Sequence, residues 1–180
     1  MTKNKLVILD RDGVINYDSD LYIKSPEEWE AIESSLRAIA RLNAADYKVA
    51  VATNQSGIGR GMFNAITLAT IHKKMEMELA SVGAHIDALE YCPDHPDQAG
   101  ENRKPNTGMI KKLLTLFDVP ASEVWFIGDS KTDIECALKI GCQPILVLTG
   151  KGKKTIELIS NERVRVFDNL AKAVDNLLNL

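Results

Sequence analysis

The sequence has few cysteines and no long apolar run. Three widely spaced cysteines in 180 residues do not make the disulfide framework of a small secreted protein, and they are typical of a reducing compartment. The longest apolar stretches, such as 6–9 and 144–148, are far shorter than the ~20 residues that a membrane-spanning helix needs. The N-terminus lacks the longer apolar segment and small-residue cleavage site of a signal peptide. We therefore expect a cytoplasmic protein with no membrane partner.

The sequence also lacks an excess of positive charge. Its 22 lysines and arginines stand against 25 aspartates and glutamates, which leaves a net charge of -3. A domain that binds duplex nucleic acid normally carries a basic surface, so we expect no nucleic-acid partner. The hydrophobic fraction of 45% is typical of a globular protein. No long exposed apolar stripe stands out, and we expect a monomer.

Two kinds of segment alternate along the whole chain. Short apolar runs without polar alternation are typical of strands buried on both faces, and stretches with helical periodicity lie between them. This repetition predicts an α/β fold, a three-layer doubly wound parallel sheet with helices on both faces. Because no linker or internal repeat is present, residues 1–180 are predicted to form one domain. The expected strands are 5–9, 49–52, 88–91, 124–127 and 145–148, and the expected helices centre on 36–42, 68–79, 110–117, 134–140 and 170–177.

Two irregular stretches, 16–30 and 93–107, are longer than the other predicted connections. Long loops in a compact domain are usually functional or mobile, so both are candidates for the site. Trp29 falls in the first of them, whereas Trp125 falls in a predicted strand. We therefore expect Trp125 to be the tryptophan that belongs to the core.

Polar residues follow several of the predicted strands. Asp10 and Asp12 come directly after the first strand, Thr53 after the second and Asp129 after the fourth, and Lys104 lies in the second long loop. In an open parallel sheet, ligands bind beyond the carboxyl ends of the strands. A single aspartate at a strand end is most often a turn or cap residue. Several polar clusters at the same edge of one sheet favour a functional site.

Together these residue types suit phosphoryl transfer. Asp10, Asp12 and Asp129 offer oxygen ligands for Mg2+, which prefers carboxylates, water and phosphate. A carboxylate can attack phosphorus and form an aspartyl phosphate. Asp12 lies on the same side of an extended chain as Asp10, where it can protonate a leaving oxygen and later deprotonate a water. Thr53 and Lys104 can neutralise charge on the phosphoryl oxygens.

Four short motifs carry a family resemblance. In their order and spacing they resemble the motifs of the haloacid dehalogenase (HAD) superfamily of phosphatases. The resemblance implies a Rossmann-like HAD fold without a large cap domain. It also implies Asp10 as nucleophile, Asp12 as proton donor and base, Thr53 and Lys104 as phosphoryl stabilisers, and Mg2+ bound by Asp10, the Asp12 carbonyl and Asp129. The motifs are DRDG at 10–13, TNQ at 53–55, KP at 104–105 and GDSKTD at 128–133.

Longer matches narrow the resemblance to the histidinol-phosphatase-like subfamily. The stretches DRDGVIN, TNQSGIGRG and RKPNTGM favour a small-molecule sugar bisphosphate as substrate, whose product feeds the synthesis of activated sugar for surface polysaccharide. Histidinol phosphate and other small phosphate esters remain alternative substrates. The net negative charge of the chain argues against a polynucleotide substrate. Without a cap domain, loops must select the substrate, and Arg103 is expected to help recognise it. The residues expected to line the sugar pocket are Asp18, Ser19, Asp20, Leu21, Asn54, Gln55 and Ser56.

The chain departs from this subfamily at a zinc loop. Members typically carry Cys-x-His and then Cys-x-Cys just before the Arg-Lys-Pro. Here Cys92 is present, but Asp94 stands two residues on, His95 comes one step late, and 97–102 contains no cysteine. A tetrahedral structural zinc needs four good ligands. We therefore expect no structural zinc.

Some assignments stay open at this level. Asp133 either orients Lys104 or a metal-bound water, or only occupies a first helical turn. Arg60 is either a second anion contact or an exposed loop tip. The segment 150–155 resembles a P-loop, but it fails the Walker A spacing and is interpreted as a basic surface turn that an anionic substrate could touch.

Two other classes of protein fit parts of this pattern. A signalling receiver domain also arranges Asp, Thr and Lys around Mg2+, but its phosphoacceptor lies on a middle strand. In this sequence the Asp-x-Asp pair follows the first strand. A non-catalytic binding module is disfavoured because every catalytic position is intact.

Overall fold

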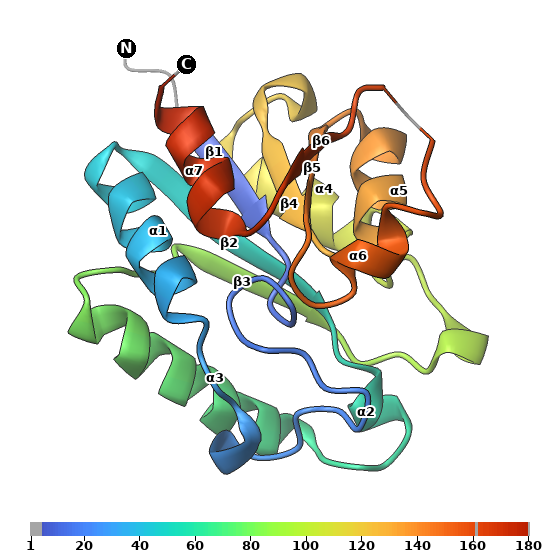
Figure 1. Ribbon diagram of the computed structural model, residues 1–180. Coiled ribbons are helices and arrows are strands. Elements are labelled where there is room, and N and C mark those ends of the chain that lie inside the picture. The colour runs from blue at the N-terminus through green and yellow to red at the C-terminus, as the bar shows by residue number, and fades with distance from the viewer. Residues whose placement is uncertain (1–4, 161, 180) are drawn as a thin grey trace.

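The computed structural model describes residues 5–160 and 162–179. In this part of the chain, six strands form one sheet in the order β3-β2-β1-β4-β5-β6, and every neighbouring pair is parallel (Figure 1). The strands are β1 (Lys5–Leu9), β2 (Tyr47–Asn54), β3 (Ala88–Cys92), β4 (Trp125–Gly128), β5 (Gln143–Val147) and β6 (Arg165–Phe167).

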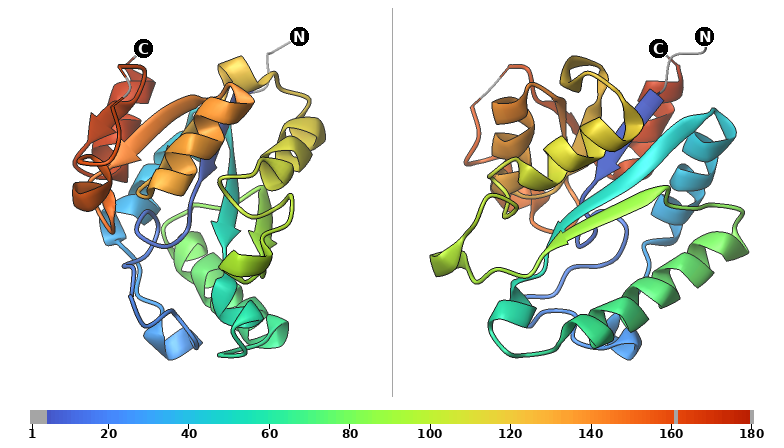
Figure 2. Two further views of the ribbon diagram at one scale, coloured as in Figure 1. Left: turned by 90° about the vertical axis from the view of Figure 1, so that its right-hand side faces the viewer. Right: turned by 180° about the vertical axis from the view of Figure 1, so that it is seen from behind.

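The longer helices cover both faces of the sheet (Figure 2). Successive residues of β1 point to opposite faces, as the pleat of a strand requires. Leu6 and Ile8 pack with α4 and α5, whereas Val7 and Leu9 pack with α1, α3 and α7. The predicted three-layer, doubly wound α/β fold is confirmed. These helices are α1 (Glu33–Ala44), α3 (Ala65–Ser81), α4 (Gly108–Phe117), α5 (Lys131–Ile140) and α7 (Leu170–Leu178).

Several short elements were not predicted. The strand β6 has only three residues, an arginine followed by two apolar residues, and none of them is fully buried at this edge of the sheet, so it shows no buried apolar run. Two helices of one turn, α2 (Ser56–Gly59) and α6 (Gly152–Thr155), follow β2 and β5. A single turn is too short to display helical periodicity. Turns of 3-10 helix lie at Pro26–Glu28, Pro96–Gln98 and Ala121–Glu123.

The expectation for the two tryptophans was wrong. Trp29 is completely buried in the core beneath α1 and α3, and Trp125 is only half-buried. The first long loop folds back over the sheet, and the Lys74 ammonium holds it there by donating to the Trp29 carbonyl at 2.7 Å. Trp125 stands at the first position of β4, where the guanidinium of Arg165 lies 5.1 Å from its ring centroid.

The strand order places the carboxyl ends of β1 and β4 side by side. From β1 the chain continues through α1 to β2, and from β4 it continues through α5 to β5 on the opposite side. Ligands bind at such a reversal of winding in doubly wound sheets. The residues that follow the two strands are Asp10 and Asp129, and the Asp10 N–H still donates to the Ile127 carbonyl at 3.0 Å. Within the described residues, no helix combines the length and apolar character that a bilayer crossing demands.

Candidate active site

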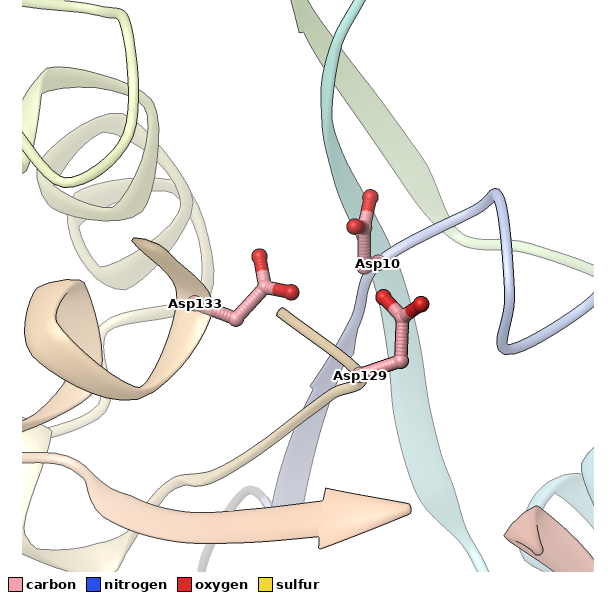
Figure 3. Close-up of side chains that lie close together, drawn as sticks. All are labelled: Asp10, Asp129 and Asp133. Carbon is pink, nitrogen blue, oxygen red and sulfur yellow. The ribbon is translucent and has the colours of Figure 1, made fainter. Parts of the chain in front are cut away.

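Three carboxylates point into a common space beyond β1 and β4 (Figure 3). Asp10 follows β1, Asp129 follows β4 and Asp133 lies in the first turn of α5, and each offers an oxygen within 4.8 Å of the others. The Asp133 side chain also caps α5, because its Oδ2 accepts from the Ser130 N–H at 3.0 Å and from the Ser130 hydroxyl at 2.6 Å. Gly128 permits this approach, since a Cβ there would overlap the Asp133 side chain.

The Lys104 ammonium lies inside this acidic group and is almost fully buried. Its Nζ lies 3.0 Å from Asp10 and 2.7 Å from Asp133, and it donates to the Ala52 carbonyl at 2.6 Å. Burial alone would lower the pKa of Lys104, but the two carboxylates raise it above its usual value. The side-chain amide of Asn54 fixes the loop by pairing with the Lys104 N–H and carbonyl, both at 3.0 Å. Of the roles left open for Asp133, the geometry therefore supports pairing with Lys104 together with capping of the helix.

Asp12 is held by a second cation, the completely buried Arg11. The Arg11 Nη2 lies 2.8 Å from one Asp12 oxygen and 3.1 Å from the other, while Nη1 lies 3.1 Å from the Nε2 of His72. Asn16 and Gln55 also donate to Asp12, both at 2.9 Å. Burial would raise the pKa of Asp12, but Arg11 and these hydrogen bonds hold it below its usual value. Sequence reasoning missed Arg11 and His72, because nothing local in the sequence marks their contact.

The two acids nearest the end of the sheet have raised pKa values. Burial raises the pKa of Asp10 to about 7, with a further contribution from the Asp133 carboxylate that Lys104 partly offsets. Burial, and then repulsion by Asp10 and Asp133, raises the pKa of Asp129 to about 8. The cluster therefore holds more negative charge than Lys104 compensates, which is a situation that a bound divalent cation relieves.

The donor set fits Mg2+. Asp10 and Asp129 present carboxylate oxygens, which are the ligands that a hard cation prefers. The carbonyl oxygen of Asp12 accepts none of the hydrogen bonds of its turn, because Gly13 donates to the Asn16 carbonyl at 2.8 Å and the next amides donate to the Arg11 carbonyl. Asp10 uses Oδ1 to accept from the Arg11 N–H and to pair with Lys104, and Asp129 uses Oδ2 to accept from the Lys151 N–H. The second carboxylate oxygen of each, together with the Asp12 carbonyl, can meet an ion.

Two neighbouring glycines lie against the Asp129 carboxylate. Gly13 has a φ of +79° and Gly150 a φ of +54°, and a Cβ at either position would overlap the Asp129 carboxylate. The Lys151 N–H then donates to Asp129 Oδ2 at 2.7 Å. Glycine is the residue that adopts positive φ without strain and allows such a close approach.

A cavity of about 580 Å3 opens over the acids. Both long loops contribute to its wall, as do the segments that follow β4 and β5. Thr53 lies buried below the cavity at the end of β2, where its hydroxyl accepts from the Gln55 amide at 2.9 Å. The lining residues that sequence reasoning expected are Asp10, Asp12, Asp18, Ser19, Asp20, Asn54, Gln55, Ser56, Arg103, Lys104 and Asp129.

Leu21 is a correction to the expected sugar pocket. Its side chain is 76% exposed and does not line the cavity. A turn closed by the Tyr22 N–H, which donates to the Ser19 carbonyl at 3.0 Å, sets Leu21 at the outer side of the loop. Arg60 likewise does not line the cavity, and its guanidinium lies 6.0 Å from the ring centroid of Tyr22.

Sequence reasoning did not assign the lysines that α5 and α6 add to the cavity. Lys131 comes from the start of α5, and Lys151 and Lys154 come from the 150–155 segment. We interpreted that segment as a basic surface turn that an anionic substrate could touch. It follows β5, which lies next to β4. Its position after a strand of the predicted parallel sheet was the signal that could have placed it at the site.

Comparison with known proteins finds relatives that match nearly the whole chain. The HAD-hydrolase-like family model matches residues 101–173. A D-glycero-beta-D-manno-heptose-1,7-bisphosphate 7-phosphatase from Pseudomonas putida is 48% identical, over 97% of this chain and 99% of the relative. The enzyme of the same name from Pseudomonas aeruginosa is 46% identical, over 96% and 97%. A crystal structure of D,D-heptose 1,7-bisphosphate phosphatase from B. bronchiseptica, complexed with magnesium and phosphate, superposes with a TM-score of 0.95 at 47% identity, over 97% of this chain and 98% of that chain.

Proposed function

This chain is a HAD-superfamily phosphatase that belongs to the family of D-glycero-beta-D-manno-heptose-1,7-bisphosphate 7-phosphatases, and we propose that it removes the C7 phosphate of heptose 1,7-bisphosphate. One observation carries the proposal: Asp10, Asp12, Lys104 and Asp129 meet at the floor of a single cavity that is large enough for a sugar phosphate. The product would serve the synthesis of activated heptose for surface polysaccharide.

In the first step, an Asp10 oxygen attacks the phosphorus atom in line with the leaving sugar oxygen. The bond between phosphorus and the C7 oxygen breaks, and that oxygen takes a proton from Asp12, which is therefore protonated when the substrate is bound. The negative charge of the phosphate beside Asp12 raises the pKa of this carboxyl from its low value in the free chain and favours that form. The products are a sugar hydroxyl and a phosphate ester of the Asp10 carboxylate. The Asp10 side chain is 13% exposed and that of Asp12 is 21% exposed, so both carboxylates are accessible from the cavity.

In the second step, a water attacks the phosphorus of the aspartyl phosphate and gives its proton to Asp12. The bond between phosphorus and Asp10 breaks, which releases inorganic phosphate and restores both aspartates. We assign Lys104 and Thr53 to the stabilisation of the equatorial phosphoryl oxygens, where charge accumulates in each step. The Lys104–Asp133 pair at 2.7 Å supports this role, because it holds the ammonium in place.

Phosphatases of this superfamily use Mg2+, and the magnesium and phosphate complex from B. bronchiseptica is similar to this chain over nearly its whole length. We propose that Asp10, the Asp12 carbonyl and Asp129 hold the ion here. When bound, it supplies positive charge that neutralises the phosphoryl group and the acids around it.

We infer further that Arg103 and the loop residues 18–20 and 54–56 select a small sugar bisphosphate. The chain is proposed to act as a cytoplasmic monomer of one domain, without a nucleic-acid or membrane partner. It is also proposed to lack a structural zinc. In support, the 93–102 loop is held by Asp94, whose carboxylate accepts from the Gly100 N–H at 2.9 Å and whose carbonyl accepts from Arg103 at 3.0 Å. Elemental analysis that finds one tightly held zinc per chain would overturn that inference.

The test is phosphate release in Mg2+ from heptose 1,7-bisphosphate, histidinol phosphate and a 3'-phosphorylated oligonucleotide. We expect a strong preference for the heptose bisphosphate, abolished by Asp10→Asn. Asp118→Asn is the matched control, because it makes the same chemical change at the exposed end of α4. Preference for histidinol phosphate would replace the proposed substrate, and full activity of Asp10→Asn would refute the assigned nucleophile.

A further inference from the structure

The basic groups of the cavity differ in what they already bind. Lys104 is paired with Asp10 and Asp133, Arg103 donates to a backbone carbonyl, and Lys131 lies 3.5 Å from Glu135. These cations are partly committed before any substrate arrives. The 150–155 segment supplies two more cations to the cavity. None of its side chains takes part in the two reaction steps.

Lys151 and Lys154 stand on the α6 side of the cavity mouth. The Lys151 ammonium lies 3.4 Å from Asp18 of the first long loop, so the two sides of the mouth are joined by an ion pair. Lys154 is exposed and forms no ion pair within the part of the chain that the structure describes. Unlike Lys151, Lys154 can therefore pair with a ligand without first giving up a carboxylate.

The cavity has room for a second group beside these lysines. A recess of about 240 Å3 adjoins it and shares four of its lining residues, Asp18, Asp20, Lys151 and Lys154. The cavity is also lined by Asp10, Asp12 and Asp129. Their negative charge repels the phosphate that is not cleaved, because Mg2+ and Lys104 offset the charge of the reacting phosphate only. A substrate with two phosphates therefore needs positive charge away from these acids.

We propose that Lys154, assisted by Lys151, forms the subsite for the second, uncleaved phosphate of the substrate. This inference rests on the proposed function, because it takes a bisphosphate as the substrate. The two lysines act as specificity residues and take no part in bond breaking. A phosphate in the recess also meets the carboxylates of Asp18 and Asp20, so it has to displace Asp18 from Lys151. It meets Lys154 without the loss of an existing ion pair.

The test compares kcat/KM for heptose 1,7-bisphosphate with kcat/KM for heptose 7-phosphate, which lacks the second phosphate. In Lys154→Met the ratio of the two should fall about tenfold or more, through a higher KM for the bisphosphate, because one charge-assisted contact is lost. Lys154→Arg should keep most of the ratio. Lys153→Met is the matched control, because it removes the same charge from the same helix at a position that does not line the cavity.

The possible results distinguish a wrong subsite from a wrong function. If the wild type prefers the bisphosphate and Lys154→Met loses the same factor on both substrates, or loses nothing, the subsite is refuted and the proposed function stands. If Lys153→Met lowers the ratio as much as Lys154→Met does, the effect is general electrostatics and the subsite is again refuted. A wild type that prefers the monophosphate refutes both proposals.

Discussion

The buried guanidinium of Arg11 lies 3.1 Å from the Nε2 of His72, which belongs to α3, sixty-one residues further along the chain. Burial and the charge of Arg11 lower the pKa of His72 to about 4, so the ring is neutral near pH 7 and Nε2 can accept a hydrogen bond. The remaining donors of Arg11 bind Asp12. His72 is therefore a positioning residue that reaches the proposed proton donor through Arg11.

Replacing His72 with Phe should weaken both the fold and the activity. The change leaves a buried Arg11 N–H without its acceptor, which costs about 1–3 kcal/mol. We expect a lower Tm and a lower kcat with little change in KM, because Arg11 no longer holds Asp12 in one orientation. His72→Gln keeps an acceptor and should restore most of both. His85→Phe is the control, since the His85 side chain is 61% exposed, and equal losses in the two Phe variants would contradict the positioning role.

His72 also predicts a pH dependence of stability. Its pKa is about 4 in the folded chain and 6.5 when unperturbed, so between these values the unfolded chain binds more protons than the folded chain. The contribution of His72 to the free energy of unfolding should therefore fall as pH falls from about 6.5 to about 4, although Asp10 and Asp129 contribute with the opposite sign over this interval. In urea titrations the difference in free energy of unfolding between the wild type and His72→Gln isolates this contribution, and it should shift against the wild type as pH falls. A difference that does not change with pH would show that His72 does not cause it.

Lys104→Met tests the buried ion pairs. It leaves Asp10 and Asp133 close together without their shared cation, and breaking a buried pair in this way costs about 3–5 kcal/mol. We expect a large fall in the free energy of unfolding and loss of phosphatase activity. Lys48→Met removes one partner of the Lys48–Asp87 pair, whose lysine is half exposed, and should cost about 1 kcal/mol or less. Similar costs for the two variants in chemical denaturation would contradict the argument.

Magnesium binding should tighten as pH rises. In the metal-free chain the pKa values of Asp10 and Asp129 are raised to about 7 and about 8, so between about pH 4 and 8 the folded chain binds more protons than the unfolded chain. Without metal these groups make the fold less stable as pH rises. Mg2+ displaces the protons, so its stabilising effect should increase over the same interval. Thermal denaturation from about pH 5 to 9 measures the stability of the metal-free chain in EDTA and that of the metal-bound chain in saturating Mg2+. A gain in Tm on adding Mg2+ that does not change with pH would contradict the prediction.

Gly13→Ala should displace the Asp129 carboxylate. The new Cβ would overlap this side chain and would also stand at a positive φ. Gly83→Ala is a matched control, because Gly83 has a φ of +74° and no atom within 4 Å of an added Cβ. Both variants should lose about 1–2 kcal/mol through backbone strain. Only Gly13→Ala should also weaken Mg2+ binding in calorimetry, and equal metal affinity in the two variants would mean that Asp129 is not held by this contact.

Much of the fold could be predicted because the pattern that carries it is local. A strand covered on both faces must be apolar throughout, and β1, β4 and β5 were each located to within two residues at either end. The strand β3 was located as closely, although it lies at an edge of the sheet and includes Glu90. The start of β2 was missed, because Tyr47 is only partly buried and Lys48 is exposed, although both pair with the start of β1. At β6 the edge position removes the need for an apolar run.

Hydrophobic periodicity and motifs of a few residues are enough to predict the α/β class, the sheet edge at which the polar residues gather, and the residue types available there for phosphoryl transfer. Four other features are visible only in the folded chain. They are the Lys104–Asp133 ion pair, the contact of His72 with Arg11, the burial of Trp29 and the position of Lys154 at the cavity. Each of these features depends on how segments far apart in the chain pack together, which a local sequence pattern does not predict.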